Sequence, residues 1–405
     1  MLKKFLFKVF ARRHFWRYAT FSEVGELYAA KTMRVVALNL GSGFASVYLY
    51  KIGYSLEFII GFWALFFIMK GLMAVPSGIF AAKVGSKKGI LLANILYIPA
   101  MISLGFVPDV GLPALIFSGV CMGISGTLHE ICYFVEFSRV KSMAHAGKEI
   151  GFMNILEKIA IGVSPVIGGL IALMFGPSVT MWVAGCVFIF AAAPLFRTVD
   201  RVEKRQRIAI KGFPWRVALP SMFARVGTGF DVVGTTTIWG LFIAIVIFPQ
   251  FDNEIYVVLG VLASITIVVA IASSYIFGKL IDNRKGGLLL KTGVIADSLI
   301  HLTRAAVVSP VGVVGVNVTD EVATTAQSMA FTRGMFDTAD LSGHRVMYLM
   351  GIEVFSMVGT SLACGVFLIC LWLSSNMEIG FRVFFILTAL AVLLIMTARF
   401  QLYRK

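Results

Sequence analysis

Charged residues are scarce in this chain of 405 residues. Asp, Glu, Lys and Arg together account for 14% of the sequence, whereas they make up about a quarter of an ordinary soluble domain. Hydrophobic residues account for 59%, and the mean hydropathy is +0.89. The composition therefore excludes a typical water-soluble protein and predicts a chain that lies in a membrane.

Complete motifs for disulfides, metal binding or catalysis are also missing from the sequence. The five cysteines lie in apolar stretches without paired spacing, as small packing residues do: Cys121, Cys132, Cys186, Cys364 and Cys370. The segment from His129 to Tyr133 is one residue short of the zinc-protease pattern, because Tyr133 replaces the second histidine. We therefore expect a protein that is not an enzyme and that has neither a metal site nor a cofactor.

The first 31 residues lack the long apolar core and the small-residue cleavage site of a secretory signal peptide. They are basic and aromatic instead, which is typical of a segment that lies along the membrane surface. Aromatic rings would sit among the headgroups, and Lys and Arg would face anionic lipid. We expect residues 1–31 to form a cytoplasmic interfacial segment.

The chain instead contains about a dozen apolar runs, each near the ~20 residues that cross the core of a bilayer. We expect spans at residues 32–51, 56–81, 88–107, 111–137, 149–175, 178–196, 220–248, 254–281, 288–308, 311–333, 344–374 and 379–398. A basic cytoplasmic linker at 197–219 separates the halves 32–196 and 220–398, and residues 399–405 form a cytoplasmic tail. The predicted fold class is an all-α polytopic membrane protein with twelve transmembrane helices in two six-helix bundles.

The cations predict the orientation of these spans. The net charge is +15, but Lys and Arg lie at the ends of spans instead of forming one basic face, so we expect no nucleic-acid partner. They crowd into alternate connections, and only Lys51 lies in a predicted external loop. The positive-inside rule then places both termini in the cytoplasm.

Two connections share a pattern of glycines and charges. After the second predicted span it comprises Gly78, Lys83, Gly85, Lys87 and Lys88, and after the eighth it comprises Gly278, Asp282 and Arg284. In this pattern, the number of spans and the division into halves, the chain resembles the major facilitator superfamily. The first copy departs from the family pattern at Ala82, where the family carries an aspartate.

The resemblance implies a fold of two pseudo-symmetric bundles and a transport function. It implies that both loops form a cytoplasmic gate, in which loop cations bind helix C-termini and carboxylates in one transport state. Glu136 and Arg139 in the next cytoplasmic loop are further candidate partners. The alternative is that these are ordinary cytoplasmic loops rich in glycine and lysine.

The fifth predicted span carries small residues at helical spacing. Pro165, Gly168 and Gly169 fit a pattern that the family associates with exporters exchanging substrate for protons, and Pro165 predicts a hinge. Ordinary tight packing explains the same residues equally well. Gly119 stands where many family exporters carry an arginine, which weighs against a drug antiporter.

Ionisable residues inside spans are the candidate coupling groups, because such groups are costly in hydrocarbon and usually serve function. The candidates are Glu130, Glu157, Glu321 and Glu353, with the neighbours His129 and Asp320. From their depths, Glu130 and Glu157 are expected to face one another, and Glu321 and Glu353 to form a looser pair. Burial and a nearby like charge favour binding of a proton. The alternative is structural ion pairs with Lys158 or Arg34.

Two other groups of polar residues lie in spans of the second half. Asp297, His301 and Arg304 share one helix face, where they either shuttle protons or satisfy one another. The family resemblance further implies that the first, fourth, seventh and tenth spans line a central path. From these we select Asn39, Asp231, Trp239 and Asn317 as substrate-cavity candidates.

These expectations combine into a secondary active transporter that moves a small solute by alternating access. We expect proton-coupled export, or antiport, of a metabolite or drug-like compound by a monomer in a bacterial inner (plasma) membrane. Proton-coupled uptake or facilitated transport is the first alternative. A membrane scaffold or receptor that keeps the fold without transporting is the second, and Ala82 and Gly119 favour it.

Overall fold

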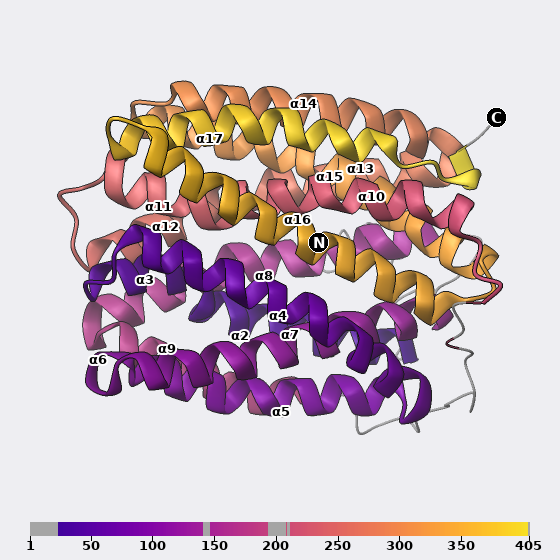
Figure 1. Cartoon of the computed structure of the whole chain (residues 1–405), viewed down its shortest axis with the longest axis horizontal. Coiled ribbons are helices and arrows are strands. Elements are labelled where there is room, and N and C mark those ends of the chain that lie inside the picture. The colour runs from indigo at the N-terminus through magenta and orange to yellow at the C-terminus, as the bar shows by residue number, and fades with distance from the viewer. Residues whose placement is uncertain (1–22, 141–145, 193–207, 209–210, 404–405) are drawn as a thin grey trace, which may run out of the picture.

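The structure, a computed structural model, describes residues 23–140, 146–192, 208 and 211–403. Within these residues the regular secondary structure is helical, and no strand occurs. The helices run roughly along the long axis of the molecule (Figure 1). The predicted all-helical class is therefore confirmed for the described part of the chain.

The described residues of the first half form eight α-helices of very different length. They are α2 (Glu23–Leu40), α3 (Ala45–Lys51), α4 (Leu56–Lys83), α5 (Ser86–Gly105), α7 (Leu112–Val140), α8 (Ala146–Phe175) and α9 (Pro177–Ala192), with the single turn α6 (Val107–Val110) before α7. A 3₁₀ turn, Ser42–Phe44, joins α2 to α3, so that these two form one bent unit.

The second half begins with α10 (Trp215–Val232), which continues through the π-helix η4 (Val233–Ile238), α11 (Trp239–Phe242) and the π-helix η5 (Ile243–Ile247). The remaining elements are α12 (Glu254–Ile265), α13 (Ile267–Leu280), η6 (Ile281–Lys285), α14 (Gly286–Ala306), α15 (Pro310–Leu341), α16 (Arg345–Leu373), α17 (Met377–Val392), η7 (Leu393–Thr397) and η8 (Gln401–Tyr403).

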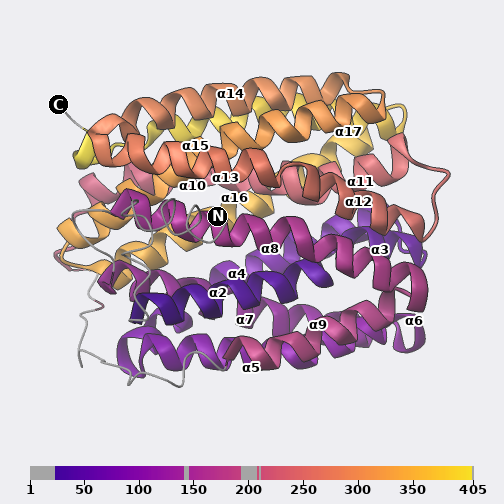
Figure 2. The same cartoon turned by 180° about the vertical axis from the view of Figure 1, so that it is seen from behind.

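The two halves lie side by side, with α2 to α9 on one side and α10 to α17 on the other (Figures 1 and 2). Helix α8 packs against α12 and α13, and α4 packs against α16. These two contacts join the halves along most of their length. A site between them is therefore built by residues that are far apart in the sequence.

Capping side chains and glycines mark where helices begin. The hydroxyls of Ser55 and Ser309 accept hydrogen bonds from the first turns of α4 and α15, and Asn376 does the same for α17. Gly85, which starts α5 directly after α4, has a φ of +123°, a conformation that favours glycine. The chain therefore turns tightly in this loop.

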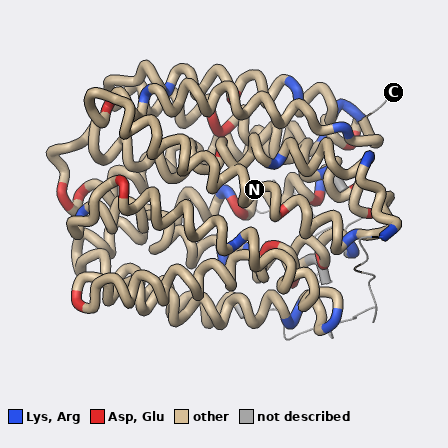
Figure 3. The backbone as a smooth tube through the Cα atoms, viewed as in Figure 1, with Lys and Arg blue, Asp and Glu red and all other residues tan. Residues whose placement is uncertain are grey.

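The outer surface is strongly apolar. Eight helical stretches are long and apolar enough to cross a membrane, by length and composition. Leu65, Val311 and Trp372 are 69%, 81% and 84% exposed, which suits contact with lipid tails. Most described lysines and arginines gather at the end of the bundle from which the C-terminal tail leaves (Figure 3). The count of twelve spans stays a prediction.

The first helix corrects the predicted boundary at residue 32. Helix α2 begins at Glu23, so the end of the predicted interfacial segment belongs to the bundle. Leu27, Tyr28 and Ala30 are 1%, 4% and 1% exposed, and the Tyr28 ring packs against Phe152 of α8. Burial of these side chains extends the helix beyond the apolar run. Residues 1–22 of the predicted segment 1–31 and most of the linker 197–219 lie outside the described residues.

Candidate functional site

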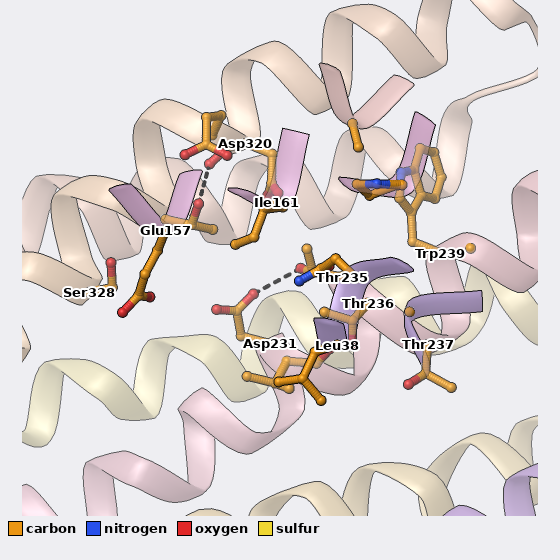
Figure 4. Close-up of a pocket in the computed structure, with 18 of the residues that line it drawn as sticks. Leu38, Glu157, Ile161, Asp231, Thr235, Thr236, Thr237, Trp239, Asp320 and Ser328 are labelled. Atoms are coloured by element: carbon orange, nitrogen blue, oxygen red, sulfur yellow. Dashed lines mark hydrogen bonds between the residues drawn. The ribbon is translucent and has the colours of Figure 1, made fainter. Parts of the chain in front are cut away.

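A cavity of about 1020 Å³ lies between the two halves. Its wall is built from both: α2, α7 and α8 contribute on one side, and α10, α12 and α15 on the other. Glu157, Asp231, Asp320 and Trp239 surround a common space (Figure 4). Of the residues selected from the sequence, the wall contains Asn39, Glu130, Glu157, Pro165, Asp231, Trp239, Asn317, Asp320 and Glu321.

Lys31 links the two acids of the first half. Its Nζ lies 3.9 Å from Glu130 Oε2 and 3.9 Å from Glu157 Oε1. The expectation that these two acids face one another is therefore confirmed. The side chains of Glu130 and Glu157 are 32% and 26% exposed, so that water in the cavity reaches them.

The expected pair of Glu321 and Glu353 is wrong. Glu321 lies 2.9 Å from Nζ of Lys158, and Glu353 lies 3.9 Å from Nζ of Lys70. Each acid thus pairs with a lysine of the other half, because the docking of α15 on α8 and of α16 on α4 sets their neighbours. Lys158, which the sequence offered as a structural partner for the acids, has this role for Glu321.

Glu353 and His129 lie away from the cavity wall described above. Glu353 is 2% exposed and His129 is also 2% exposed. The imidazole of His129 stacks on the ring of Tyr133, with a centroid distance of 5.8 Å. Neither side chain is among those that line the cavity.

A second ionisable cluster lies where α10, α14 and α15 meet. Arg304 is fully buried, lies 2.9 Å from Asp320 Oδ2 and donates a hydrogen bond of 2.9 Å to Thr235 Oγ1. Its guanidinium also lies 5.4 Å from the ring centroid of Trp239. Arg304 therefore ties α14 to α15 and to the π-helix η4.

Asp231 and Asp297 complete this cluster. The amide Nε2 of Gln327 donates to both, at 3.1 Å to Asp231 Oδ2 and 2.7 Å to Asp297 Oδ2. His301 Nε2 lies 3.3 Å from Asp231 Oδ1, and Thr235 Oγ1 donates to the same oxygen at 3.0 Å. Figure 4 shows Asp231 beside Thr235 at the cavity wall.

The remaining cavity candidates are fixed by hydrogen bonds. The indole Nε1 of Trp239 donates to Asn317 Oδ1 at 2.8 Å, which joins α11 to α15. Asn39 Nδ2 donates to the carbonyl of Val35 one turn earlier, at 2.9 Å. All three polar or aromatic side chains are thus held in defined positions on the wall.

A family model described as Major Facilitator Superfamily matches residues 35–345. This match covers more than half of the chain and spans parts of both halves. The chain belongs to the Major Facilitator Superfamily. It is therefore a multi-pass membrane protein of a family of transporters. No curated protein matches the chain.

The superfamily's loop motif lies at contacts between the halves. The Gly147 N–H of α8 donates to Asp282 Oδ1 at 2.8 Å, and Ser138 Oγ donates to Asp340 Oδ1 at 3.1 Å. A Cβ on Gly78 would lie 2.7 Å from Met350 Sδ. These contacts join the first half to the second at the cation-rich end, where the gate is predicted.

Other residues of the predicted gate make contacts within one half. Lys87 lies 3.9 Å from Glu26, and Arg139 lies 2.7 Å from Glu136 on the same helix. Lys83 and Lys88 are exposed. Arg284 has a φ of +60° within η6, where α13 turns into α14. Gly278 differs from them, because it contacts the other half: a Cβ there would lie 3.0 Å from the Gly147 carbonyl oxygen of α8.

The small residues of α8 form close helix contacts. A Cβ on Gly168 would lie 2.2 Å from the Leu40 carbonyl oxygen, and one on Gly169 would lie 2.6 Å from the Tyr256 carbonyl oxygen. Pro165 packs its backbone against Gly260 of α12 in the same way. These small residues thus make close helix contacts, and the hinge stays a prediction.

Two residues of the site, Lys31 and Gln327, are not predicted from the sequence. Lys31 was assigned to the cytoplasmic segment, although Leu27, Ala30, Arg34 and Ala37 already have the spacing of a buried helix face. Gln327 carries no charge, so a search for intramembrane ions does not reveal it. Only the meeting of α10, α14 and α15 shows that it bridges two carboxylates.

Proposed function

We propose that this protein is a secondary active transporter with twelve membrane spans, which moves a small solute by alternating access and couples its export to protons. The observation that carries this proposal is the cavity of about 1020 Å³ whose wall is shared by both halves. A solute held there contacts both bundles, so rocking of one against the other exposes it to either side.

Ion pairs between the halves provide a physical link to protons. The pair of Lys158 and Glu321 at 2.9 Å joins α8 to α15 at the cavity wall. A proton on Glu321 removes the charge of the acid and weakens this link, which favours separation of the halves on that side. Glu130, Glu157 and Asp320 also line the cavity, where protons delivered through water reach them.

The orientation follows from the cations. Most described lysines and arginines lie at one end of the bundle (Figure 3), and the positive-inside rule assigns that end to the cytoplasm. The contacts of Asp282 and Asp340 with the first half then form the cytoplasmic gate. Export is favoured over uptake because α8 carries the glycine-and-proline pattern of family exporters.

The test of alternating access is cysteine labelling in vesicles. Asn39→Cys and Asn317→Cys, in a chain whose native cysteines are serine, are treated with a membrane-impermeant maleimide from each side. We expect both positions to react from both sides in turn. The control Leu65→Cys, 69% exposed on the outer surface, is expected to react from neither side. A scaffold or receptor without a transport cycle shows access from one side only.

Proton coupling is tested on the same cysteines. We expect the labelling rates to change with pH in the parent chain and this change to be reduced in Glu321→Gln. The matched control is Glu378→Gln, an acid paired with Arg382 at the start of α17, where half of the side chain is exposed. Identical pH dependence in the parent and Glu321→Gln contradicts the proposed link.

A further inference from the structure

The two aspartates beside the cavity lack a cationic partner within the described structure. Asp231 is 7% exposed and Asp297 is fully buried, and both are held by the amide group of Gln327. The nearby guanidinium of Arg304 contacts Asp320 and Thr235. Every cavity acid of the first half, in contrast, has a lysine within 4 Å.

His301 does not supply the missing charge. Nη1 of Arg304 can only donate a hydrogen bond and lies 3.1 Å from His301 Nδ1 and 3.5 Å from Nε2; because Nε2 faces the Asp231 carboxylate, we assign Nδ1 as the acceptor. The remaining proton is then on Nε2, which donates to Asp231 Oδ1 at 3.3 Å. The imidazole is therefore neutral and orients Asp231. The two carboxyl groups thus have no contacting cation among the described residues, in a largely buried site where unpaired ions cost several kcal/mol each.

Two oxygen atoms of this site lack a hydrogen-bond partner in the described structure. They are Oδ1 of Asp297 and Oε1 of Gln327, and both are buried. Buried polar atoms are almost always paired with protein, water or an ion. Because the O and N atoms of a side-chain amide exchange places by a half-turn, Gln327 also has a state in which its oxygen faces both carboxylates.

We propose that Asp231, Asp297 and Gln327 form a binding site for a hard metal cation, such as Na⁺ or Ca²⁺. Carboxylate oxygens of Asp231 and Asp297 lie within 4.8 Å of one another, a space that suits one ion between them. Carboxylate and amide oxygens are the ligands of hard cations, whereas the imidazole here presents an N–H. Asp231 and Gln327 line the cavity, which gives the ion a path.

The site also borders the π-helix η4, which begins two residues after Asp231. Such insertions in α-helices occur frequently at functional sites. Thr235 of this segment binds both Asp231 and Arg304. The π-helix thus holds the Thr235 hydroxyl between the Asp231 carboxylate and the Arg304 guanidinium.

Cation binding is tested by thermal unfolding of the purified full-length protein in nanodiscs. Choline chloride is replaced by NaCl or by CaCl₂ at constant ionic strength and at several pH values. We expect a saturable rise of the Tm with one of the two metals, because a ligand of the folded state stabilises it. A Tm that changes with pH alone, with no response to either metal, overturns the proposal in favour of protons.

Three variants test which residues form the cation site. Asp297→Asn is expected to abolish the metal response, and His301→Gln to weaken the apparent affinity about 10- to 100-fold, as for residues that orient a ligand. The control Glu353→Gln changes an equally buried acid that pairs with Lys70 and is expected to bind like the parent. An unchanged apparent affinity in Asp297→Asn overturns the assignment.

Direct binding of ²²Na⁺ or ⁴⁵Ca²⁺ to the parent chain covers the case in which Asp297→Asn does not fold. Saturable binding of one tracer supports the site, and absence of binding of both tracers overturns it. These measurements need neither a transported solute nor a pH gradient. Their failure therefore leaves the transport proposal intact, and a failed transport assay leaves the cation site intact.

Discussion

The acids of the first half and those of the second are solvated in different ways. Glu130 and Glu157 share Lys31 and are 32% and 26% exposed toward the cavity. Asp297 is fully buried, and its neighbours Gln327 and His301 are neutral. Water and a lysine stabilise the first pair, whereas the second depends on fixed dipoles and on Arg304 nearby. The free energy of burying two acids inside the membrane therefore differs between the two halves.

The largest change in stability is expected when Arg304 is removed. This arginine is the cation of the buried cluster of Asp231, Asp297 and Asp320, which we call the dry cluster. Arg304→Met leaves Asp320 without its partner at 2.9 Å and removes the guanidinium that lies near Asp231 and Asp297. We expect the free energy of unfolding to fall by about 3–5 kcal/mol, the usual effect of breaking a buried ion pair. Reversible unfolding in SDS, followed by circular dichroism, measures it.

Arg34→Met is the matched control for this variant. Arg34 is 3% exposed, but it donates to the neutral side chains of Asn94 and Ser125, at 2.7 and 3.1 Å. Its loss leaves neutral groups unpaired, which costs about 1–3 kcal/mol. Asp320→Asn added to Arg304→Met is expected to restore part of the lost stability. An equal loss in both single variants contradicts the difference drawn between the clusters.

Helix positions were largely predictable because a bilayer requires long apolar runs. The predicted span at 56–81 and helix α4 (Leu56–Lys83) begin at the same residue. The first span was placed too late because Glu23 and Glu26 make its beginning polar, although that turn packs on α8. Apolar content therefore identifies spans well where lipid surrounds the helix and less well where protein does.

The partners of the acids were not predictable in the same way. Lys158 and Glu321 are separated by 163 positions, and their contact depends on how α15 docks against α8. Sequence depth correctly brought Glu130 and Glu157 together because they lie on consecutive long helices of one half. It wrongly paired Glu321 with Glu353, since depth alone does not tell which side of a helix faces the other half.

Removal of Lys31 tests the cluster of Lys31, Glu130 and Glu157, which is exposed to the cavity. Lys31→Met leaves Glu130 and Glu157 without their shared lysine, but both acids keep contact with the cavity. We expect a loss of about 1–3 kcal/mol in the free energy of unfolding, between the values for exposed and buried pairs. The same SDS titration measures it. Lys279→Met, an exposed lysine over the Tyr275 ring, is the control and is expected to change little.

The pair that joins the halves is measured by a double-mutant cycle. Lys158→Met and Glu321→Gln, alone and together, are expected to give a coupling energy of about 1 kcal/mol, because the contact of 2.9 Å is partly exposed. The more exposed pair of Glu378 and Arg382 on one helix serves as reference, with about 0.3–0.5 kcal/mol. A coupling near zero for the first pair means that it does not hold the halves together.

The smallest effect is expected at an exposed ion pair that does not line the cavity. Lys51 lies 3.5 Å from Asp252, whose side chain is 85% exposed, and also donates to the carbonyl of Phe251. Asp252→Asn removes a charge that water already stabilises, so we expect the free energy of unfolding to change by less than about 0.5 kcal/mol. If this variant instead lost as much stability as Arg304→Met, burial would not be the property that separates the acids of this protein. A result within the expected range sets the baseline against which the dry cluster is compared.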